Sequence, residues 1–307
     1  MDFESVARRV FDLYGEQRYD EALQVVAGAA TDHLDRDDRL TFWRACLLAM
    51  AERSTEALEV LQQGLQRGLW WAPDLLDDSD LDSVRALPAW SEVEHRCSEA
   101  AERFSRRFRP EPLIRPSSAA VPAGTVLTFH AYAADPVAHA ARWFGAVPPP
   151  WTVVVPAGTV PLSEKLRAWP RRDAAAGIGS QLHGLRFPSP AVLAGYSQGG
   201  GVAADLAWAG TVDVAGLILV APALGTRRWD SNAPRGVPAY IVVGEHDRFL
   251  QDCLELGTRL HEAGVPVLVD QRPGLGHRVP EDLEETVTEA LEWIGQHAGA
   301  QSGGAQM

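Results

Sequence analysis

The sequence predicts an α/β protein in which a mainly parallel sheet is covered by helices on both faces and is preceded by a smaller all-helical domain. From residue 124 onward, short continuous apolar runs alternate with segments of helix-type composition. This is the pattern of a parallel sheet buried on both faces. Before residue 109, by contrast, apolar residues such as Val6, Val10 and Leu13 recur at helical spacing. The two textures indicate two domains.

Composition and charge narrow the class of protein. The 307 residues are 46% hydrophobic and 22% charged, as in globular chains long enough for two cores. The formal net charge of -13 disfavours nucleic acid as a partner, because binding to phosphates needs Lys and Arg patches. The cysteines at 46, 97 and 253 lie far apart, so they predict neither a disulfide framework nor a zinc site. No signal peptide and no membrane-spanning run is evident, and we expect a cytoplasmic protein.

The helical domain is expected over residues 1–109 and contains two self-similar segments, 19–26 and 54–61. Their spacing is about one tetratricopeptide period, and Tyr19-Asp20-Glu21-Ala22-Leu23 resembles the start of the second helix of such a repeat. This resemblance implies a domain that can hold a protein partner. An acidic stretch follows at residues 78–82, but it lacks the glycine and glutamate of a calcium loop and is interpreted as helix caps. A further amphipathic helix is expected at residues 91–107.

Four prolines at positions 110, 112, 116 and 122 indicate a proline-rich junction over residues 110–123. The α/β domain is expected at 124–297 and a flexible tail at 298–307. Because the two domains are expected to have separate cores, a chain beginning near Pro110 is expected to fold and to keep its activity without residues 1–109. Strands are predicted at 125–129, 151–155, 191–194, 215–220, 239–243 and 266–269, with an edge strand at Leu113 and Ile114. Helices are predicted at 136–145, 162–184, 198–209, 249–263 and 279–296.

The motif Gly195-Tyr196-Ser197-Gln198-Gly199 lies between a predicted strand and a predicted helix. Glycines two residues before and two after a serine allow a sharp turn that exposes the hydroxyl. An ordinary flexible turn is the alternative interpretation. Two later strands also run into titratable residues, in Gly244-Glu245-His246-Asp247 and in Gly274-Leu275-Gly276-His277. In a parallel sheet these groups meet at the carboxyl edge of the strands.

The order of serine, acid and histidine is that of α/β-hydrolases. The three segments resemble the carboxylesterase and acyl-protein thioesterase branch of that superfamily, over residues 112–297. The resemblance implies that Ser197 is the nucleophile, His277 the base and Asp247 the orienting acid. Asp247 is preferred to Glu245 or Asp252 because it stands at the family's acid position; as alternatives, Asp247 caps the following helix and His277 is a loop histidine.

The same resemblance implies an oxyanion hole, formed by the backbone N–H groups of Gln198 and Tyr132. The family usually has His-Gly in the second loop, whereas this chain has His130-Ala131. If the family glycine needs a positive φ, the loop here must differ. The rings of His130 and His246 are interpreted as structural and as exposed, respectively.

We therefore expect a hydrolase that cleaves small-molecule carboxylic esters or thioesters through an acyl-serine intermediate. The alternative is a tetratricopeptide-type protein-binding module with an inactive or incidental hydrolase fold. Acyl transfer to an acceptor other than water, peptidase action and lipid hydrolysis stay open, because fold and triad do not set specificity. Tyr132, Trp169 and Leu224 are expected to line the acyl pocket. No cofactor is implied, because the Gly177-Ile178-Gly179 cluster lacks a dinucleotide motif, and Arg171 and Arg172 are more typical of a solvated helix start than of an anion site.

Overall fold

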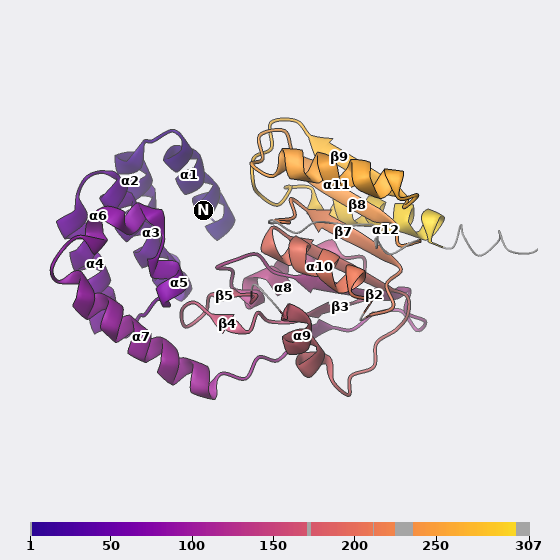
Figure 1. The fold of residues 1–307 in the computed structure, drawn as a ribbon, viewed down its shortest axis with the longest axis horizontal. Helices are drawn as coiled ribbons and strands as arrows, with labels where there is room; N and C mark the ends of the chain where they lie inside the picture. The colour runs from indigo at the N-terminus through magenta and orange to yellow at the C-terminus, as the bar shows by residue number, and fades with distance from the viewer. Residues whose placement is uncertain (1, 171–172, 211, 225–235, 299–307) are drawn as a thin grey trace, which may run out of the picture. The chain divides into compact units, whose positions relative to one another are not determined.

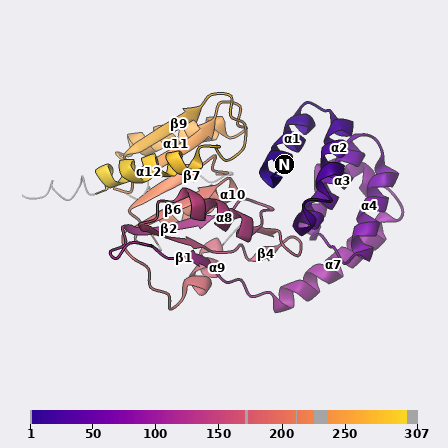
Figure 2. The same cartoon turned by 180° about the vertical axis from the view of Figure 1, so that it is seen from behind.

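The structure is a computed structural model that describes residues 2–170, 173–210, 212–224 and 236–298. It divides into two compact units, which are traced by colour in Figures 1 and 2. The first unit comprises Met1–Arg109 together with Pro161–Leu166, and the second comprises the rest of the chain. The short segment 161–166 therefore packs with a domain that precedes it by more than fifty residues. Apart from Ala298, the expected tail at 298–307 lies outside the described residues.

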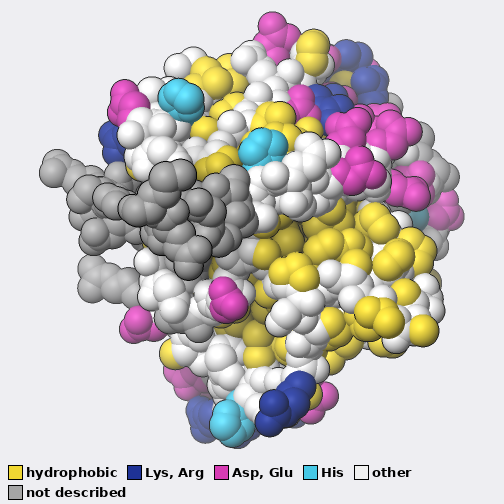
Figure 3. Space-filling model, turned by 90° about the vertical axis from the view of Figure 1, so that its right-hand side faces the viewer, with side chains coloured by type: hydrophobic (Ala, Val, Ile, Leu, Met, Phe, Trp, Pro, Cys, Tyr) yellow, Lys and Arg dark blue, Asp and Glu magenta, His cyan; other side chains and the backbone are white. Residues whose placement is uncertain are grey.

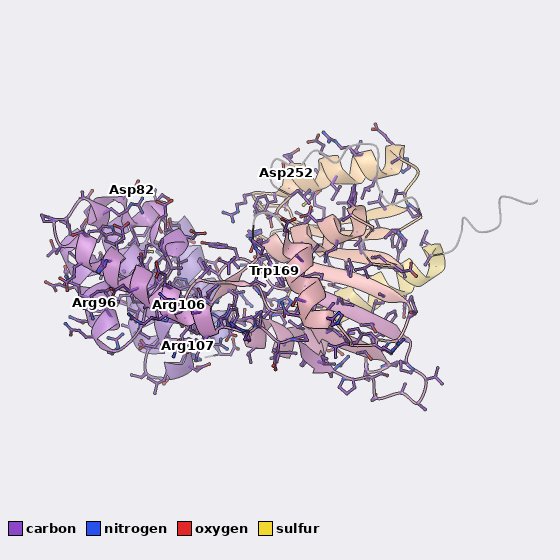
Figure 4. The ribbon with its side chains drawn as sticks, turned by 60° about the horizontal axis from the view of Figure 1, so that its bottom comes forward. Asp82, Arg96, Arg106, Arg107, Trp169 and Asp252 are labelled. Carbon is purple, nitrogen blue, oxygen red and sulfur yellow. The ribbon has the colours of Figure 1, made fainter. Side chains whose placement is uncertain are left out.

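The first unit is built of helices. They are α1 (Phe3–Gly15), α2 (Tyr19–Ala29), α3 (Asp37–Met50), α4 (Ser54–Gln66), α5 (Pro73–Leu76), α6 (Asp82–Arg85) and α7 (Trp90–Arg107), with 3₁₀ turns η1 (Leu34–Arg36) and η2 (Ser79–Leu81). Apolar residues at helical spacing form its core, including Val6, Val10 and Leu13 of α1. Arg96, Arg106 and Arg107 lie along α7 (Figure 4), whose buried residues are Trp90, Val93 and Cys97.

A second part of the helical core surrounds Trp71, whose side chain is fully buried. Its indole N–H donates a hydrogen bond to the carbonyl of Asp38 on α3, at 2.9 Å. Gly64 lies against the ring, since a Cβ there would come within 2.6 Å of Trp71. These contacts fix the chain that leads out of α4 against α3.

The second unit contains a seven-stranded sheet in the order β1-β3-β2-β6-β7-β8-β9. The strands are β1 (Leu113–Arg115), β2 (Gly124–Phe129), β3 (Trp151–Val155), β6 (Ala191–Tyr196), β7 (Gly216–Val220), β8 (Ala239–Gly244) and β9 (Val267–Arg272). All neighbours pair in parallel except β1, which pairs antiparallel with β3. The loops that follow β2, β6, β8 and β9 therefore leave from one edge of the sheet.

Helices cover both faces of this sheet (Figures 1 and 2). Residues of α9 (Ala174–Leu182), α10 (Gln198–Trp208) and α11 (Leu250–Glu262) pack on one face, with Leu127, Leu193 and Leu217. Residues of α8 (Pro136–Ala146) and α12 (Leu283–His297) pack on the other face. The alternation follows from the strand period of two, which sends successive side chains to opposite faces. The predicted fold class is confirmed.

One predicted element is wrong. The helix expected at 162–184 is confined to α9, and the chain before it forms a small two-stranded sheet of β4 (Val160–Pro161) and β5 (Arg167–Ala168). Leu162 and Leu166 are four residues apart, which is the spacing of one face of a helix. Both side chains are buried, however, in a segment that packs with the helical unit. Local spacing gave a helix where a distant packing partner requires a loop.

The surface reflects the excess of acidic residues. Figure 3 shows Asp and Glu side chains grouped beside an area of hydrophobic side chains on one face, and the formal net charge is -13. None of the helices in the described part of the chain has the length and apolarity needed to cross a membrane.

Candidate active site

Ser197 lies at the turn from β6 into α10, with φ 52° and ψ -119°. A non-glycine residue rarely adopts a positive φ, so this conformation is strained, and strain of this kind is concentrated at functional sites. The flanking glycines make the turn possible. A Cβ on Gly195 would come within 2.4 Å of the Gly199 backbone, and one on Gly199 would come within 1.9 Å of the Phe129 carbonyl oxygen. The motif thus packs the helix directly onto the ends of β6 and β2.

The structure brings the three predicted side chains together. His277 Nε2 lies 3.0 Å from Ser197 Oγ. On the other side of the ring, His277 Nδ1 lies 2.9 Å from Asp247 Oδ2 and 3.1 Å from Oδ1. The three residues come from the loops after β6, β8 and β9, and they meet at the carboxyl edge of the sheet.

The hydrogen bonds determine the tautomer of His277. An ionised carboxylate only accepts, so Nδ1 carries the proton and donates it to Asp247. The Asp247 side chain is fully buried, and its Oδ1 also accepts the Phe249 N–H at 2.8 Å. Nε2 is then the lone-pair nitrogen and accepts the Ser197 hydroxyl proton. Asp247 therefore both caps the turn before α11 and orients the imidazole.

Two aromatic residues that the sequence analysis did not single out hold His277. The Tyr196 hydroxyl donates to the His277 carbonyl at 2.9 Å, and its ring centroid lies 5.2 Å from the imidazole. The Phe249 ring meets the imidazole edge-on at 5.0 Å. The available signal in the sequence was their nearness to the predicted site residues: Tyr196 directly precedes Ser197, and Phe249 follows Asp247 by two residues.

The other candidate acids and the neighbouring histidine lie apart from this chain of hydrogen bonds. Glu245 is exposed, and its Oε2 accepts the Gly274 N–H at 3.0 Å. It therefore braces the loop that carries His277. His246 is exposed, and Asp252 lies on the exposed side of α11 (Figure 4).

The predicted oxyanion-hole residues stand at the ends of two neighbouring strands. Gln198 begins α10, so its N–H belongs to the first turn, whose N–H groups have no intrahelical acceptor. Tyr132 follows β2, which pairs with β6 as far as Phe129 opposite Gly195. The positive φ in this loop, 51°, falls at Ala133. Ala131 has no positive φ, so the alanine at the family's glycine position needs no left-handed conformation.

His130 is completely buried and supports this loop. Its Nε2 accepts the Gly158 N–H at 2.8 Å, so its Nδ1 carries the proton and donates to the Ala131 carbonyl, also at 2.8 Å. Burial lowers the pKa of His130 to about 4, and burial lowers the pKa of the neighbouring His139 well below its usual value. Both rings are neutral near pH 7. His130 is thus a structural group and does not compete with His277 as a base.

Trp169 links the two segments that are predicted to form the oxyanion hole. Its indole N–H donates to the His130 carbonyl at 2.8 Å, and its ring stacks on His130 with centroids 4.9 Å apart. Its backbone N–H donates to the Gln198 side-chain oxygen at 3.1 Å, and its carbonyl accepts from the Gln198 amide nitrogen at 3.0 Å. One residue therefore contacts both the segment with Tyr132 and the segment with Gln198.

This role corrects the expectation that Trp169 lines an open pocket. Trp169 and Leu224 are 2% and 3% exposed and belong to the core, whereas Tyr132 is 45% exposed. Arg171 and Arg172 lie outside the described residues.

The acidic stretch at residues 78–82 is engaged within the helical unit. Asp78 accepts the Asp80 N–H at 3.0 Å, and Asp80 accepts the Tyr14 hydroxyl at 2.7 Å. Across the described ranges, no group of His, Cys, Asp and Glu side chains is arranged to hold a metal ion.

Comparisons with known proteins agree with this architecture. Residues 3–104 match the family model of the A/B hydrolase-like N-terminal domain. A solved structure of an uncharacterized protein from Bacillus cereus ATCC 10987 is 18% identical, covers 96% of this chain and 99% of its own, and has a TM-score of 0.52. Esterase PE8 is 17% identical over 61% of this chain and 100% of its own, with a TM-score of 0.51. Acyl-protein thioesterase 2 from Zea mays is 13% identical over 62% of this chain and 100% of its own, with a TM-score of 0.48. A search of curated proteins found no match.

The sheet order and the turn that carries Ser197, together with the similarity to the Bacillus cereus protein and to esterase PE8, define an α/β-hydrolase-fold protein. Its first hundred residues are similar to the A/B hydrolase-like N-terminal domain. The matching model is not a tetratricopeptide model, and that resemblance stays a prediction.

Proposed function

We propose that the protein is a serine hydrolase that cleaves carboxylic esters or thioesters through an acyl-serine intermediate. The observation that carries the proposal is the continuous chain of hydrogen bonds from Ser197 Oγ through His277 to Asp247, at 3.0 and 2.9 Å. A serine hydroxyl is a weak nucleophile, and a positioned base that removes its proton during attack makes it a strong one.

The geometry supports a two-stage reaction. Ser197 Oγ attacks the acyl carbon while His277 Nε2 takes its proton, and the imidazolium then protonates the departing alcohol or thiol. The tetrahedral intermediate places its oxyanion toward the N–H groups of Gln198 and Tyr132. Water, deprotonated by the same nitrogen, attacks the acyl-serine and releases the acid. Asp247 stays ionised throughout and stabilises the imidazolium.

We further propose soluble esters or thioesters with short or medium acyl chains as the substrate class. The exposed Tyr132 ring offers an apolar wall at the end of β2, and the segments of the sheet unit between β3 and α9 are interrupted by Pro156 and Pro170. A preference that declines gradually along a series of p-nitrophenyl esters fits this class. A rate that jumps above the solubility limit of the substrate contradicts it.

The test is covalent labelling with a fluorophosphonate probe. We expect one label per chain in the unaltered protein and none in Ser197→Ala. Ser180→Ala is the matched control, since Ser180 is an exposed serine on α9, and it should label like the unaltered protein. A folded, unaltered protein that does not label refutes the proposal.

The alternative of a protein-binding module predicts that refuting result, together with a partner held by the helical unit. The triad geometry favours the enzyme. We also propose a cytoplasmic location, supported by three buried free cysteines, which suit a reducing compartment.

A further inference from the structure

The segment 161–166 packs with the helical unit, and its residues Leu162, Ser163 and Leu166 are buried. Leu162 is fully buried, and its carbonyl accepts the Ala72 N–H at 2.7 Å. The Ser163 hydroxyl donates to the buried carboxylate of Asp38 on α3. Its oxygen also accepts the Leu166 N–H at 3.0 Å, which closes the turn 163–166. Asp38 therefore fixes this turn from a position 125 residues earlier in the chain.

The residues directly after this turn hold the oxyanion-hole loop. Arg167 pairs with Ala134 through two backbone hydrogen bonds, Arg167 N–H to Ala134 O at 2.9 Å and Ala134 N–H to Arg167 O at 3.3 Å. Ala134 stands two residues after Tyr132. Trp169 then binds the His130 carbonyl and the Gln198 side chain, as described above. Arg167 and Trp169 therefore touch both ends of the loop 130–134 and the start of α10.

We propose that Asp38 and Ser163 are positioning residues for the oxyanion hole, and that the helical unit thereby contributes to the reaction at Ser197. The inference rests on the proposed function. Its physical basis is continuity of the chain: the turn fixed by Asp38 ends at Leu166, and the next residue begins the contacts that place Tyr132 and Gln198. A hydrogen-bond donor displaced by about 1 Å stabilises the oxyanion far less well, because these bonds depend steeply on distance and angle.

If this inference holds, a chain beginning near Pro110 should lose activity, in contrast to the expectation from the sequence. Such a chain lacks Asp38 and leaves Leu162 without the core that buries it.

The decisive variant is Asp38→Asn in the full chain. Asparagine keeps the size of the side chain and can keep the bond from the Arg39 N–H, which Asp38 Oδ1 accepts at 2.9 Å. Its amide nitrogen cannot accept the Ser163 hydroxyl proton, and it cannot simply reverse the bond, because Ser163 Oγ already accepts the Lys165 and Leu166 N–H groups with its two lone pairs. Asp37→Asn is the matched control, because Asp37 is adjacent on α3 and bonds Thr41 and Arg67, at 3.0 and 3.3 Å, within the helices.

Four quantities are measured for each protein. The first is the fraction of chains labelled by fluorophosphonate at completion. The others are kcat per labelled site and KM for p-nitrophenyl acetate, and the affinity for phenylboronic acid. The boronate forms a tetrahedral adduct with Ser197 that presents an oxygen to the oxyanion hole. For Asp38→Asn we expect complete labelling, kcat lowered about tenfold with KM little changed, and boronate affinity lowered by a similar factor. Loss of a whole oxyanion-hole donor costs about 10² to 10³ in kcat, and displaced donors cost less.

Asp37→Asn should match the unaltered protein. The proposal is overturned if Asp38→Asn retains both kcat per labelled site and boronate affinity, or if its losses merely follow a smaller labelled fraction. Should Asp38→Asn not fold, Ser163→Ala provides the same comparison. Absence of labelling in the unaltered protein instead refutes the proposed function, and the inference falls with it.

Discussion

Replacing Asp247 by asparagine tests the assignment of the orienting acid most directly. The Asp247 side chain is fully buried and accepts the Phe249 N–H and the single proton of His277 Nδ1, which lies within 3.1 Å of both carboxylate oxygens. Asparagine is nearly the same size, and its oxygen can still accept the Phe249 N–H. We therefore expect Asp247→Asn to fold normally and to melt near the temperature of the unaltered protein.

The expected loss of activity comes from the tautomer of His277. With the amide oxygen bound to Phe249, the asparagine NH₂ group faces Nδ1, which must then act as the acceptor. The imidazole proton moves to Nε2, and that nitrogen no longer accepts the Ser197 proton. In serine proteases the same replacement lowers kcat by roughly 10⁴. At about 1.4 kcal/mol for each factor of ten, this corresponds to a barrier higher by about 5.5 kcal/mol.

The assay measures the release of p-nitrophenol from p-nitrophenyl acetate by stopped flow. Circular dichroism gives the folded fraction of each protein, to which the rates are normalised. Glu245→Gln is the matched control, because Glu245 is an acid in the same turn whose carboxylate accepts the Gly274 N–H. We expect that control to keep most of its acylation rate. If Asp247→Asn retains more than about a tenth of the rate, the precedent for a triad aspartate does not apply and the assignment is wrong.

Two further predictions concern packing and pH. Gly199→Ala should lower the free energy of unfolding by about 1 to 3 kcal/mol or more, because its Cβ would lie 1.9 Å from the Phe129 carbonyl oxygen. Gly179→Ala is the control: a Cβ there has nothing within 4 Å, so its melting temperature should not fall. Equal melting temperatures of the two variants would contradict the packing described here. The pKa of His130 falls from 6.5 to about 4 on folding, so the unfolded state binds more protons below pH 6.5 and stability is lost as pH falls from there toward 4. Between pH 7 and pH 5 the protonation of His130 in the unfolded state should lower the free energy of unfolding by about 2 kcal/mol, which urea titration at each pH measures. In His130→Asn this decrease should be smaller. If the variant shows the same decrease, His130 is not its cause.

The sheet was predictable because its strands are buried on both faces and so appear as unbroken apolar runs, such as residues 151–155. The side chains of Ser197, Asp247 and His277 were predictable for a related reason. Each follows a parallel strand, and the topology brings such positions to one edge. The glycines around Ser197 added a local signal, since only glycine allows the close approach to Phe129.

What could not be predicted depends on partners distant in the sequence. Leu162 and Leu166 have helical spacing, yet both are buried in a segment that packs with residues 1–109, more than fifty residues earlier in the chain. Asp38 looks like any acid in the first turn of a helix. Nothing local shows that its carboxylate is buried and receives a hydroxyl from Ser163. The contacts of Trp169 with Gln198 likewise join residues whose separation carries no periodic pattern.

The packing of residues 161–166 with the helical unit also has a consequence for the order in which the protein folds during synthesis. All the helices of that unit, through α7, leave the ribosome well before Ser163 is made. Until then the site that receives Leu162 is unfilled and the Asp38 carboxylate lacks its hydroxyl donor, so the nascent unit is incomplete although its helices are present. Its last contacts form only when part of the following sheet domain has emerged. The two units, although each is compact, therefore complete their folding together.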